Sequence, residues 1–171
     1  KFKKYWPADV HVVGKGINWF HSVIWPALLM SAGIELPRTI LVHGYLTFNG
    51  DKISKSLGNA INPSDIIKKY GIDPVRYALV RDIPSNQDGD FSEDSLKSRN
   101  NGELLNDLGN LISRTLTLCE KYFDGKLSSQ KEDGLFDDLN LDKIRVYMDK
   151  YELHHALDEI WKLIRSSNKY V

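Results

Sequence analysis

Two short apolar segments, separated by one helical segment, constrain the fold of this chain more than any other feature. Residues 10–14 (Val-His-Val-Val-Gly) and residues 40–42 (Ile-Leu-Val) have the length and composition of buried strands. Between them, residues 17–32 repeat apolar side chains at helical spacing, and Gly33 follows as a stop signal. A strand, a helix and a strand in this order form a βαβ unit, which implies a parallel sheet with a right-handed crossover.

This unit is too small to be a complete domain. Two or three strands do not make a stable doubly wound sheet, so we expect the missing strands to precede Lys1 in a longer chain. Pro26 lies inside the predicted helix and should kink it or split it in two, because proline lacks a backbone N–H. The expected apolar face of this helix is formed by Trp19, Phe20, Val23, Ile24, Ala27 and Leu28.

The rest of the chain is predicted to be almost entirely helical. Asn62 followed by Pro63 is a strong helix start, and Gly71 ends that helix after about Tyr70. Ser92 is the predicted N-cap of a later helix. Further helices are expected over residues 73–80, 102–122, 142–151 and 152–171, with loops over residues 84–90 and 124–141. The chain is therefore expected to be α/β first and all-α afterwards, with the boundary near residues 90–100.

Charge is balanced overall but unevenly distributed. The 171 residues include 23 Lys or Arg and 23 Asp or Glu, so no overall basic character indicates nucleic acid. Residues 1–70 contain nine basic and four acidic residues, a net charge of +5, which leaves −5 for residues 71–171. This asymmetry favours anion binding in the first part of the chain.

Cysteine content and hydropathy indicate the cellular compartment in which the protein is expected. Cys119 is the single cysteine, which excludes an internal disulfide and a multi-cysteine zinc site, and its position on an apolar helical stripe predicts a core thiol. No apolar run is long enough for a transmembrane helix, and the N-terminus lacks the layout of a signal peptide. We therefore expect a cytoplasmic protein with no membrane partner.

Lysines and serines alternate in the segment Lys52-Ile53-Ser54-Lys55-Ser56, which Gly50 precedes and Gly58 follows. Lysine carries a mobile point charge suited to phosphate, and serine hydroxyls add neutral donors. Such a loop can close over a polyphosphate and neutralise charge that develops during its displacement. Taken alone, a basic pentapeptide of this kind is more often a solvated loop.

A second candidate site follows the first predicted strand. Gly14-Lys15-Gly16 lies between a strand and a helix, where parallel α/β sheets bind ligands, and glycines there let a nucleotide approach the backbone. As a pattern this is weak, and a structural turn is at least as frequent.

Together these segments resemble a known family. The lysine segment resembles the second signature of class I aminoacyl-tRNA synthetases, KMSKS, with Ile53 in place of Met. The leucine, isoleucine, valine and cysteine enzymes share this loop and the Asn62-Pro63 helix start. The segments Phe20-His21-Ser22-Val23-Ile24-Trp25-Pro26 and His43-Gly44-Tyr45 are more similar to the methionyl-tRNA synthetases, and the resemblance covers nearly the whole chain.

The resemblance implies roles for individual residues. Lys52 and Lys55 would be catalytic and, with Ser54 and Ser56, would bind the phosphates of ATP, which Mg²⁺ accompanies. Gly14 and Lys15 would form the nucleotide-side turn. His21 and Trp25 would bind methionine, whose thioether packs well against aromatic rings. Without the resemblance, His21 would be interpreted as a satisfied core histidine and Trp25 as core filling. No residue is expected to bind a metal directly.

Gly16 departs from the family pattern. The family normally has Asp at this position, where a carboxylate can bind ribose hydroxyls. Glycine cannot do so, which leaves adenosine binding weakened, taken over by another group, or altered by mutation.

A polar stripe on the helix predicted over residues 102–122 is a candidate for nucleic-acid binding. Asn106, Asn110 and Arg114 are four residues apart and share one face. Their amide and guanidinium groups suit unpaired bases, and the resemblance implies that they read the anticodon of a tRNA. From the residues alone, a solvated helix face is the better interpretation. The opposite side carries Leu104, Leu105, Leu108, Leu111, Ile112, Leu116 and Cys119.

The resemblance implies a fold and three regions. Residues 1–60 would be the C-terminal half of a Rossmann-type, nucleotide-binding catalytic domain, residues 61–100 a connecting helical region, and residues 101–171 part of an antiparallel, anticodon-binding helical bundle. The family's other signature, HIGH, is absent from this sequence. The N-terminal catalytic half would therefore have to be supplied in cis or in trans, and residues 1–171 alone should be inactive.

The function implied is methionine–tRNA ligase activity: ATP-dependent activation of methionine, then transfer to tRNA. Two other hypotheses remain open from the sequence. One is a non-catalytic tRNA-binding or assembly module derived from a synthetase. The other is a fragment of a leucine, valine or isoleucine enzyme.

Overall fold

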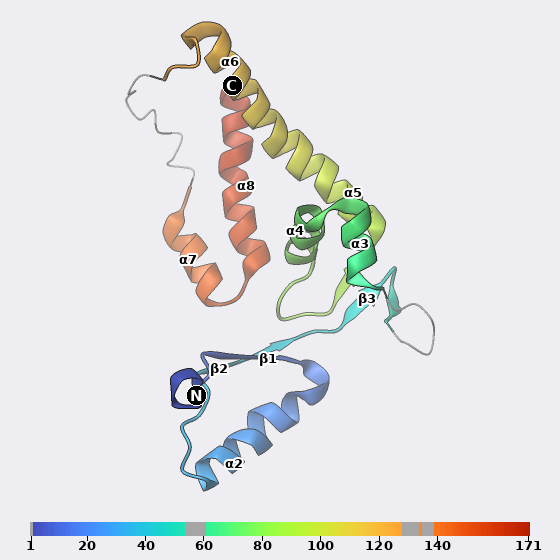
Figure 1. The fold of residues 1–171 in the computed structure, drawn as a ribbon, viewed down its shortest axis with the longest axis vertical. Coiled ribbons are helices and arrows are strands. Elements are labelled where there is room, and N and C mark those ends of the chain that lie inside the picture. Colours follow the sequence, from blue (N-terminus) through green and yellow to red (C-terminus); the bar gives the residue numbers. More distant parts are fainter. Residues whose placement is uncertain (1, 54–60, 128–133, 135–138) are drawn as a thin grey trace.

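The structure is a computed structural model that describes residues 2–53, 61–127, 134 and 139–171. It is mostly helical, with two small sheets. The first sheet and helix α2 lie at one end of the molecule, and the long helices α6 and α8 lie at the other (Figure 1). No helix within the described residues is long and apolar enough to cross a membrane.

The predicted βαβ unit is confirmed. After a short helix α1 (Phe2–Tyr5), strand β1 (Val10–Gly14) pairs in parallel with β2 (Thr39–His43). The register runs from Val10 opposite Thr39 to Gly14 opposite His43, so the two strands end together.

The helical connection between β1 and β2 changes its winding along its length. A 3₁₀ turn (Lys15–Ile17) leads into a π-helix (Phe20–Ile24), and α2 (Trp25–Ser31) continues from it. Pro26 occupies the first turn of α2, where its missing N–H breaks no α-helical hydrogen bond. The helix is thus not interrupted at Pro26, as a split would require, but its winding changes from π to α next to this residue.

The expected apolar face of this connection is not buried. Trp19 is 67% exposed and Leu28 is 58% exposed, whereas Leu29 on α2 and Val13 on β1 are buried. Two strands present too little surface to cover a helix that carries apolar residues on most of its circumference. Only the side nearest the sheet is covered.

A second sheet was not expected from the sequence. Strand β3 (Leu46–Phe48) pairs antiparallel with β4 (Asp51–Lys52) and parallel with β5 (Gly89–Phe91). The segment predicted as a polar loop over residues 84–90 thus ends in a strand. The turn between β3 and β4 consists of Asn49 and Gly50, both with positive φ (51° and 82°), which is the two-residue geometry favoured in hairpins.

Three helices follow the hairpin and surround β5. They are α3 (Pro63–Tyr70), α4 (Ile72–Asp82) and α5 (Glu93–Arg99). The predicted caps are confirmed: the Asn62 side chain accepts from Ser64 N, and the Ser92 side chain accepts from Ser95 N. Gly71 ends α3 with a φ of 85°. The main core cluster lies here and consists of Ile66, Val75, Ala78, Phe91 and Leu96.

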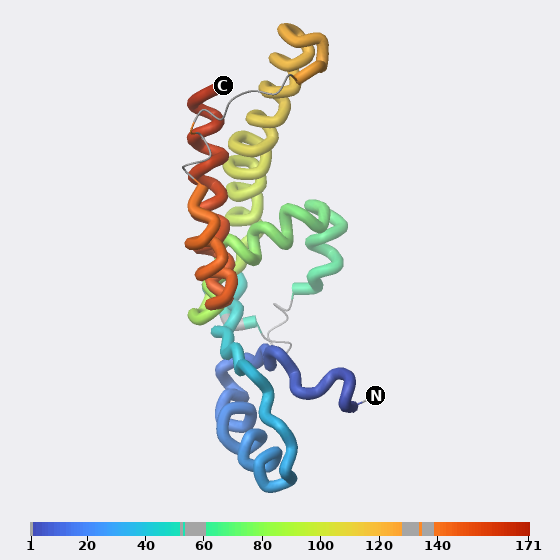
Figure 2. The backbone as a smooth tube through the Cα atoms, turned by 90° about the vertical axis from the view of Figure 1, so that its left-hand side faces the viewer, coloured from blue at the N-terminus to red at the C-terminus, as the bar shows by residue number. Residues whose placement is uncertain are grey.

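The C-terminal part consists of long helices. From α5 the chain continues without a break through a π-helix, η3 (Asn100–Gly109), into α6 (Asn110–Phe123). Helices α7 (Leu141–Asp149) and α8 (Leu153–Tyr170) form a hairpin, and α8 lies beside α6 in both views (Figures 1 and 2). The predicted helix over residues 102–122 is therefore confirmed, but its first half is π-wound.

Candidate functional site

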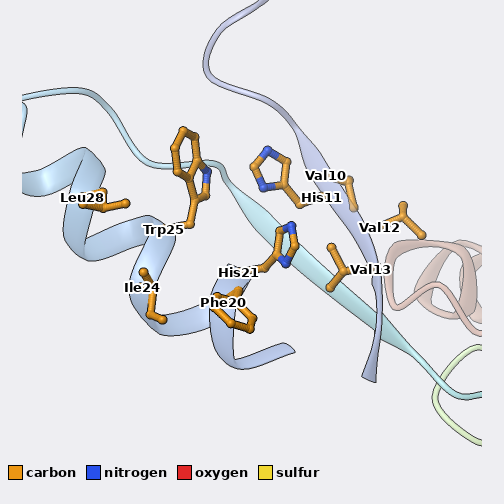
Figure 3. Close-up of a pocket in the computed structure, with 9 residues that line it drawn as sticks. All are labelled: Val10, His11, Val12, Val13, Phe20, His21, Ile24, Trp25 and Leu28. Carbon is orange, nitrogen blue, oxygen red and sulfur yellow. The ribbon is translucent and has the colours of Figure 1, made fainter. Parts of the chain in front are cut away.

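A cavity of about 580 Å³ lies between β1 and the helical connection, and both residues predicted to bind methionine line it. Figure 3 shows the His21 and Trp25 side chains directed toward this space from the connection. The cavity is lined by Val10, His11, Val12, Val13, Phe20, His21, Ile24, Trp25 and Leu28. Its walls are therefore largely apolar and aromatic, with two imidazoles as the polar groups.

The hydrogen bond of His21 fixes which ring nitrogen can accept. His21 Nδ1 lies 3.0 Å from the carbonyl oxygen of Ile17. A carbonyl only accepts, so Nδ1 carries the proton, and Nε2 of the neutral ring is an acceptor. The π-winding over Phe20–Ile24 widens the turn that holds this side chain. The site thus holds the His21 imidazole in one orientation within a largely apolar surround.

An aromatic cluster supports Trp25. Trp6 packs edge-on against Trp25, with ring centroids 6.2 Å apart, and lies 5.9 Å from the ring of His11. Trp6 is itself held, because its Nε1 donates to the carbonyl oxygen of Glu35 at 2.7 Å. No sequence motif marks Trp6 or His11 as part of this site. Only proximity in the fold connects them to this cavity.

Gly14 and Lys15 lie at the carboxyl end of the parallel pair, next to a second cavity of about 470 Å³. Lys15 Nζ contacts both carboxylate oxygens of Asp88 at 2.6 Å and lies 4.5 Å from the centre of the Tyr45 ring. Asp88 also accepts from Tyr45 N at 2.8 Å. The Lys15 ammonium, and next the Tyr45 N–H, hold the pKa of Asp88 below its ordinary value. The positive charge of this turn is therefore paired.

Two glycines at this edge of the sheet allow other parts of the chain to lie very close to their backbone. A Cβ on Gly44 would lie 2.1 Å from the backbone oxygen of Gln87, so the link between β2 and β3 can pass the loop before β5 only with glycine there. A Cβ on Gly16 would lie 2.6 Å from the hydroxyl oxygen of Tyr45. The Gly16 contact involves the end of a side chain that can rotate, whereas the Gly44 contact involves fixed backbone.

The lysine segment begins at the β3–β4 hairpin. Lys52 is the last residue of β4, and its backbone pairs with Thr47. Ser54, Lys55 and Ser56 lie outside the described residues, as does the side chain of Lys52. Their predicted contacts with ATP phosphates therefore remain predictions.

The predicted nucleic-acid stripe is exposed. Asn106 lies on η3, and Asn110 and Arg114 lie on α6, all three with exposed side chains. The other side of this helix is less buried than expected. Cys119, predicted to be a core thiol, is half-buried, and Leu105, Ile112 and Leu116 are at least half exposed.

A buried ionic cluster lies at the base of the stripe. The Glu103 side chain on η3 is 9% exposed, and its carboxylate is 3.1 Å from Arg81 Nε, 2.8 Å from Arg99 Nη1 and 3.4 Å from Arg165 Nη2. The Tyr77 hydroxyl also donates to it. Burial raises the pKa of the Glu103 carboxyl, but hydrogen bonds from Arg81 and Tyr77 outweigh burial and place it below the ordinary value. This cluster joins α4, α5, η3 and α8.

No group of three or more His, Cys, Asp or Glu residues suited to a metal ion occurs in the part of the chain that the structure describes. The rings of His154 and His155 contact each other in a tilted arrangement, with ring centroids 4.0 Å apart. His154 is half-buried on α8, and His155 lies 3.5 Å from Asp158. The pair is part of the helix packing.

Comparisons with known proteins agree on one family. The model "tRNA synthetases class I (M)" matches residues 1–116. The chain is 52% identical over its whole length to a methionine–tRNA ligase from Caldanaerobacter subterraneus and 51% identical, over 99% of the chain, to one from Thermotoga maritima. In each case it covers 28% of that protein.

A solved structure is also similar. Methionyl-tRNA synthetase of Mycobacterium tuberculosis, bound by methionyl-adenylate, superposes with a TM-score of 0.89 at 43% identity over 99% of this chain and 34% of that one. The chain thus spans between about a quarter and a third of the length of these relatives. Taken with the family model, these similarities place the chain in the class I tRNA synthetases of the methionine type.

Proposed function

We propose that this chain supplies the second half of the activation site and the first part of the anticodon-binding bundle of a methionine–tRNA ligase. The activity proposed for the whole protein has two steps. Methionine first displaces pyrophosphate from ATP to form methionyl-adenylate, and the methionyl group is then transferred to the 3′ end of tRNA. Residues 1–60 would belong to a Rossmann-type catalytic domain, residues 61–100 to a connecting region, and residues 101–171 to the bundle.

The observation that best supports this proposal is the cavity beside β1, which is lined by both His21 and Trp25. Its aromatic wall suits a thioether, because sulfur packs favourably against ring edges. Gly14 is the last residue of the strand that lines this cavity, and Lys15 follows it directly. An amino acid in the cavity and a nucleotide at the turn would therefore lie next to each other, as adenylate formation requires.

The residues of this chain would act by positioning and by electrostatics. ATP enters as its magnesium complex. Lys52 and Lys55, with Ser54 and Ser56, would neutralise charge that develops on the leaving pyrophosphate. No covalent intermediate with the protein is required, because the methionine carboxylate is itself the nucleophile that attacks the α-phosphate.

The tRNA would be bound by the exposed stripe. Asn106, Asn110 and Arg114 offer amide and guanidinium groups to unpaired anticodon bases. Their exposure on one long helix is what supports this assignment.

The test is a pair of assays on a full-length protein that carries this sequence. Methionine-dependent exchange of pyrophosphate into ATP should be fast and should not occur with leucine, valine or isoleucine. Charging of methionine tRNA should accompany it. A protein that binds tRNA but catalyses no exchange would favour the non-catalytic module instead.

The variant Lys55→Ala tests the electrostatic role. We expect the single-turnover rate of adenylate formation to fall about 30- to 1000-fold while methionine affinity is unchanged. Lys68→Ala, which removes an exposed lysine 3.7 Å from Asp65, is the matched control and should leave the rate unaltered. An unchanged rate in Lys55→Ala would show that this lysine is only a solvated loop residue.

A further inference from the structure

The hairpin that carries Lys52 is anchored to β5 through its turn. Asn49 N donates to the backbone oxygen of Phe91 at 3.2 Å, and Gly50 N donates to Asp90 Oδ1 at 2.8 Å. Both turn residues thus use their N–H groups to bond β5. This attachment fixes the turn in addition to the pairing of β3 with β5.

Asp90 binds the hairpin at two points. The same Oδ1 atom that accepts from Gly50 N also accepts from the Thr47 hydroxyl at 2.5 Å. The Thr47 hydrogen bond, followed by the Gly50 N–H, lowers the pKa of the Asp90 carboxyl, so the side chain is a charged acceptor at neutral pH.

Both donor residues, Thr47 and Gly50, lie next to Lys52 in the hairpin. Thr47 is the residue that pairs directly with Lys52 across the hairpin, and Gly50 is two residues before it. One carboxylate oxygen therefore holds both the strand opposite Lys52 and the turn that leads to it.

Strand β4 has few other attachments. It is two residues long, and within the described residues it pairs only with β3, at an edge of the sheet. A two-residue strand at the edge of a sheet has few backbone hydrogen bonds to hold it, so an additional anchor helps to fix its position. Asp90 is placed to supply it.

We propose that Asp90 is a positioning residue for Lys52: through Thr47 and Gly50 it sets where the lysine segment leaves the sheet, and so promotes adenylate formation. The inference rests on the proposed function and assigns to Asp90 a role that no sequence motif marked. Asp90 does not touch substrate in this scheme. Its effect should appear in the rate of the chemical step.

The experiment uses the full-length protein, with active sites counted by titration. Asp90→Ala and Thr47→Val should each lower the single-turnover rate of adenylate formation at saturating ATP and methionine, on the order of 10-fold for Asp90→Ala. Methionine affinity and the transfer of methionyl from preformed adenylate to tRNA should be unchanged. Thr47→Ser, which keeps the hydroxyl, should restore most of the rate.

Two controls separate positioning from general damage. Asp142→Asn removes a carboxylate whose side chain is 92% exposed and which pairs only with Arg145 in the described structure, and it should behave as the parent. Hydrogen exchange of the Gly50 amide should accelerate in Asp90→Ala, independently of activity. If the full-length protein without substitutions shows no exchange activity, the proposed function is overturned. An active parent whose Asp90→Ala variant forms adenylate equally fast would overturn this inference alone.

Discussion

Lys15 and Asp88 are 73 residues apart in the chain, yet Lys15 Nζ lies 2.6 Å from both carboxylate oxygens of Asp88. The ion pair joins the turn after β1 to the loop that precedes β5. Two residues further on, Asp90 holds the β3–β4 turn. Alternate residues of an extended segment point to the same side, so these two carboxylates connect the turn after β1 and the β3–β4 hairpin to one short segment.

The first prediction concerns Asp88→Asn. Asparagine keeps an acceptor for Tyr45 N but removes the charge that pairs with Lys15, whose ammonium is then available to an anion. We expect the KM for ATP to fall about 2- to 5-fold, and to rise more steeply with salt than in the parent, because an exposed charge is screened. Steady-state exchange kinetics at two salt concentrations measure both effects. An unchanged KM would indicate that Lys15 does not face the nucleotide.

The second prediction concerns Gly16→Asp, which introduces the residue that the family normally has. Its Cβ meets the end of the Tyr45 side chain, which is 44% exposed and can move aside. The new carboxylate can then accept from ribose hydroxyls. A charged acceptor is worth about 1.5–3 kcal/mol, so we expect the KM for ATP to fall roughly 10- to 150-fold.

Gly16→Ala is the matched control for that change. It adds the same Cβ contact with Tyr45 but no acceptor, so its KM for ATP should equal or exceed that of the parent. If Ala and Asp at this position give the same KM, the ribose is bound elsewhere and another group has taken over the role.

Local signals in the sequence were sufficient to predict much of the fold. The strands β1 and β2 and the caps Asn62 and Ser92 each depend on a few neighbouring residues, and the structure bears them out. His21 and Trp25 meet in one cavity because they are four positions apart on one helical connection.

Long-range pairing is what the sequence did not reveal. Strands β3 and β5 are three residues each and lie more than 40 residues apart, too short for an alternation pattern. The Asn49-Gly50 pair is a hairpin signal, but nothing in the neighbouring sequence identifies β5 as the further partner of β3. The partners of Lys15 and Glu103 likewise become visible only when distant segments are brought together.

The third prediction concerns stability and its dependence on pH. Glu103→Gln leaves the surrounding arginines without their shared counter-charge. Breaking a buried ion pair from one side costs about 3–5 kcal/mol, and since glutamine keeps one acceptor we expect a loss of about 3 kcal/mol in the free energy of unfolding. Urea denaturation at pH 7 measures it. Asp142→Asn, at an exposed pair, should change stability by less than about 0.5 kcal/mol.

The pH dependence of this contribution follows from the direction of the pKa change. The pKa of Glu103 is lower in the folded protein than in the unfolded chain. Its contribution is therefore fully present above the unfolded value, about 4.3, and is lost as the pH falls through the folded value. The stability difference between parent and Glu103→Gln should accordingly be constant near neutrality and shrink in acid. A difference that does not shrink in acid would mean that the charge of Glu103 contributes nothing.

The last prediction tests the exposed stripe through Arg114→Ala. Adenylate formation requires no tRNA, whereas charging does, so the ratio of the two rates isolates contacts with tRNA. A stacked or hydrogen-bonded base is worth about 1–3 kcal/mol, and we therefore expect kcat/KM for tRNA to fall on the order of 5- to 150-fold with exchange unchanged. In this variant, altering the anticodon should lower kcat/KM for tRNA little further, because the group that reads the anticodon is already absent. Arg145→Ala, which removes an exposed arginine on α7, should leave both reactions as in the parent. If Arg114→Ala still discriminates against altered anticodons as the parent does, the stripe is an ordinary solvated face and the anticodon is read elsewhere.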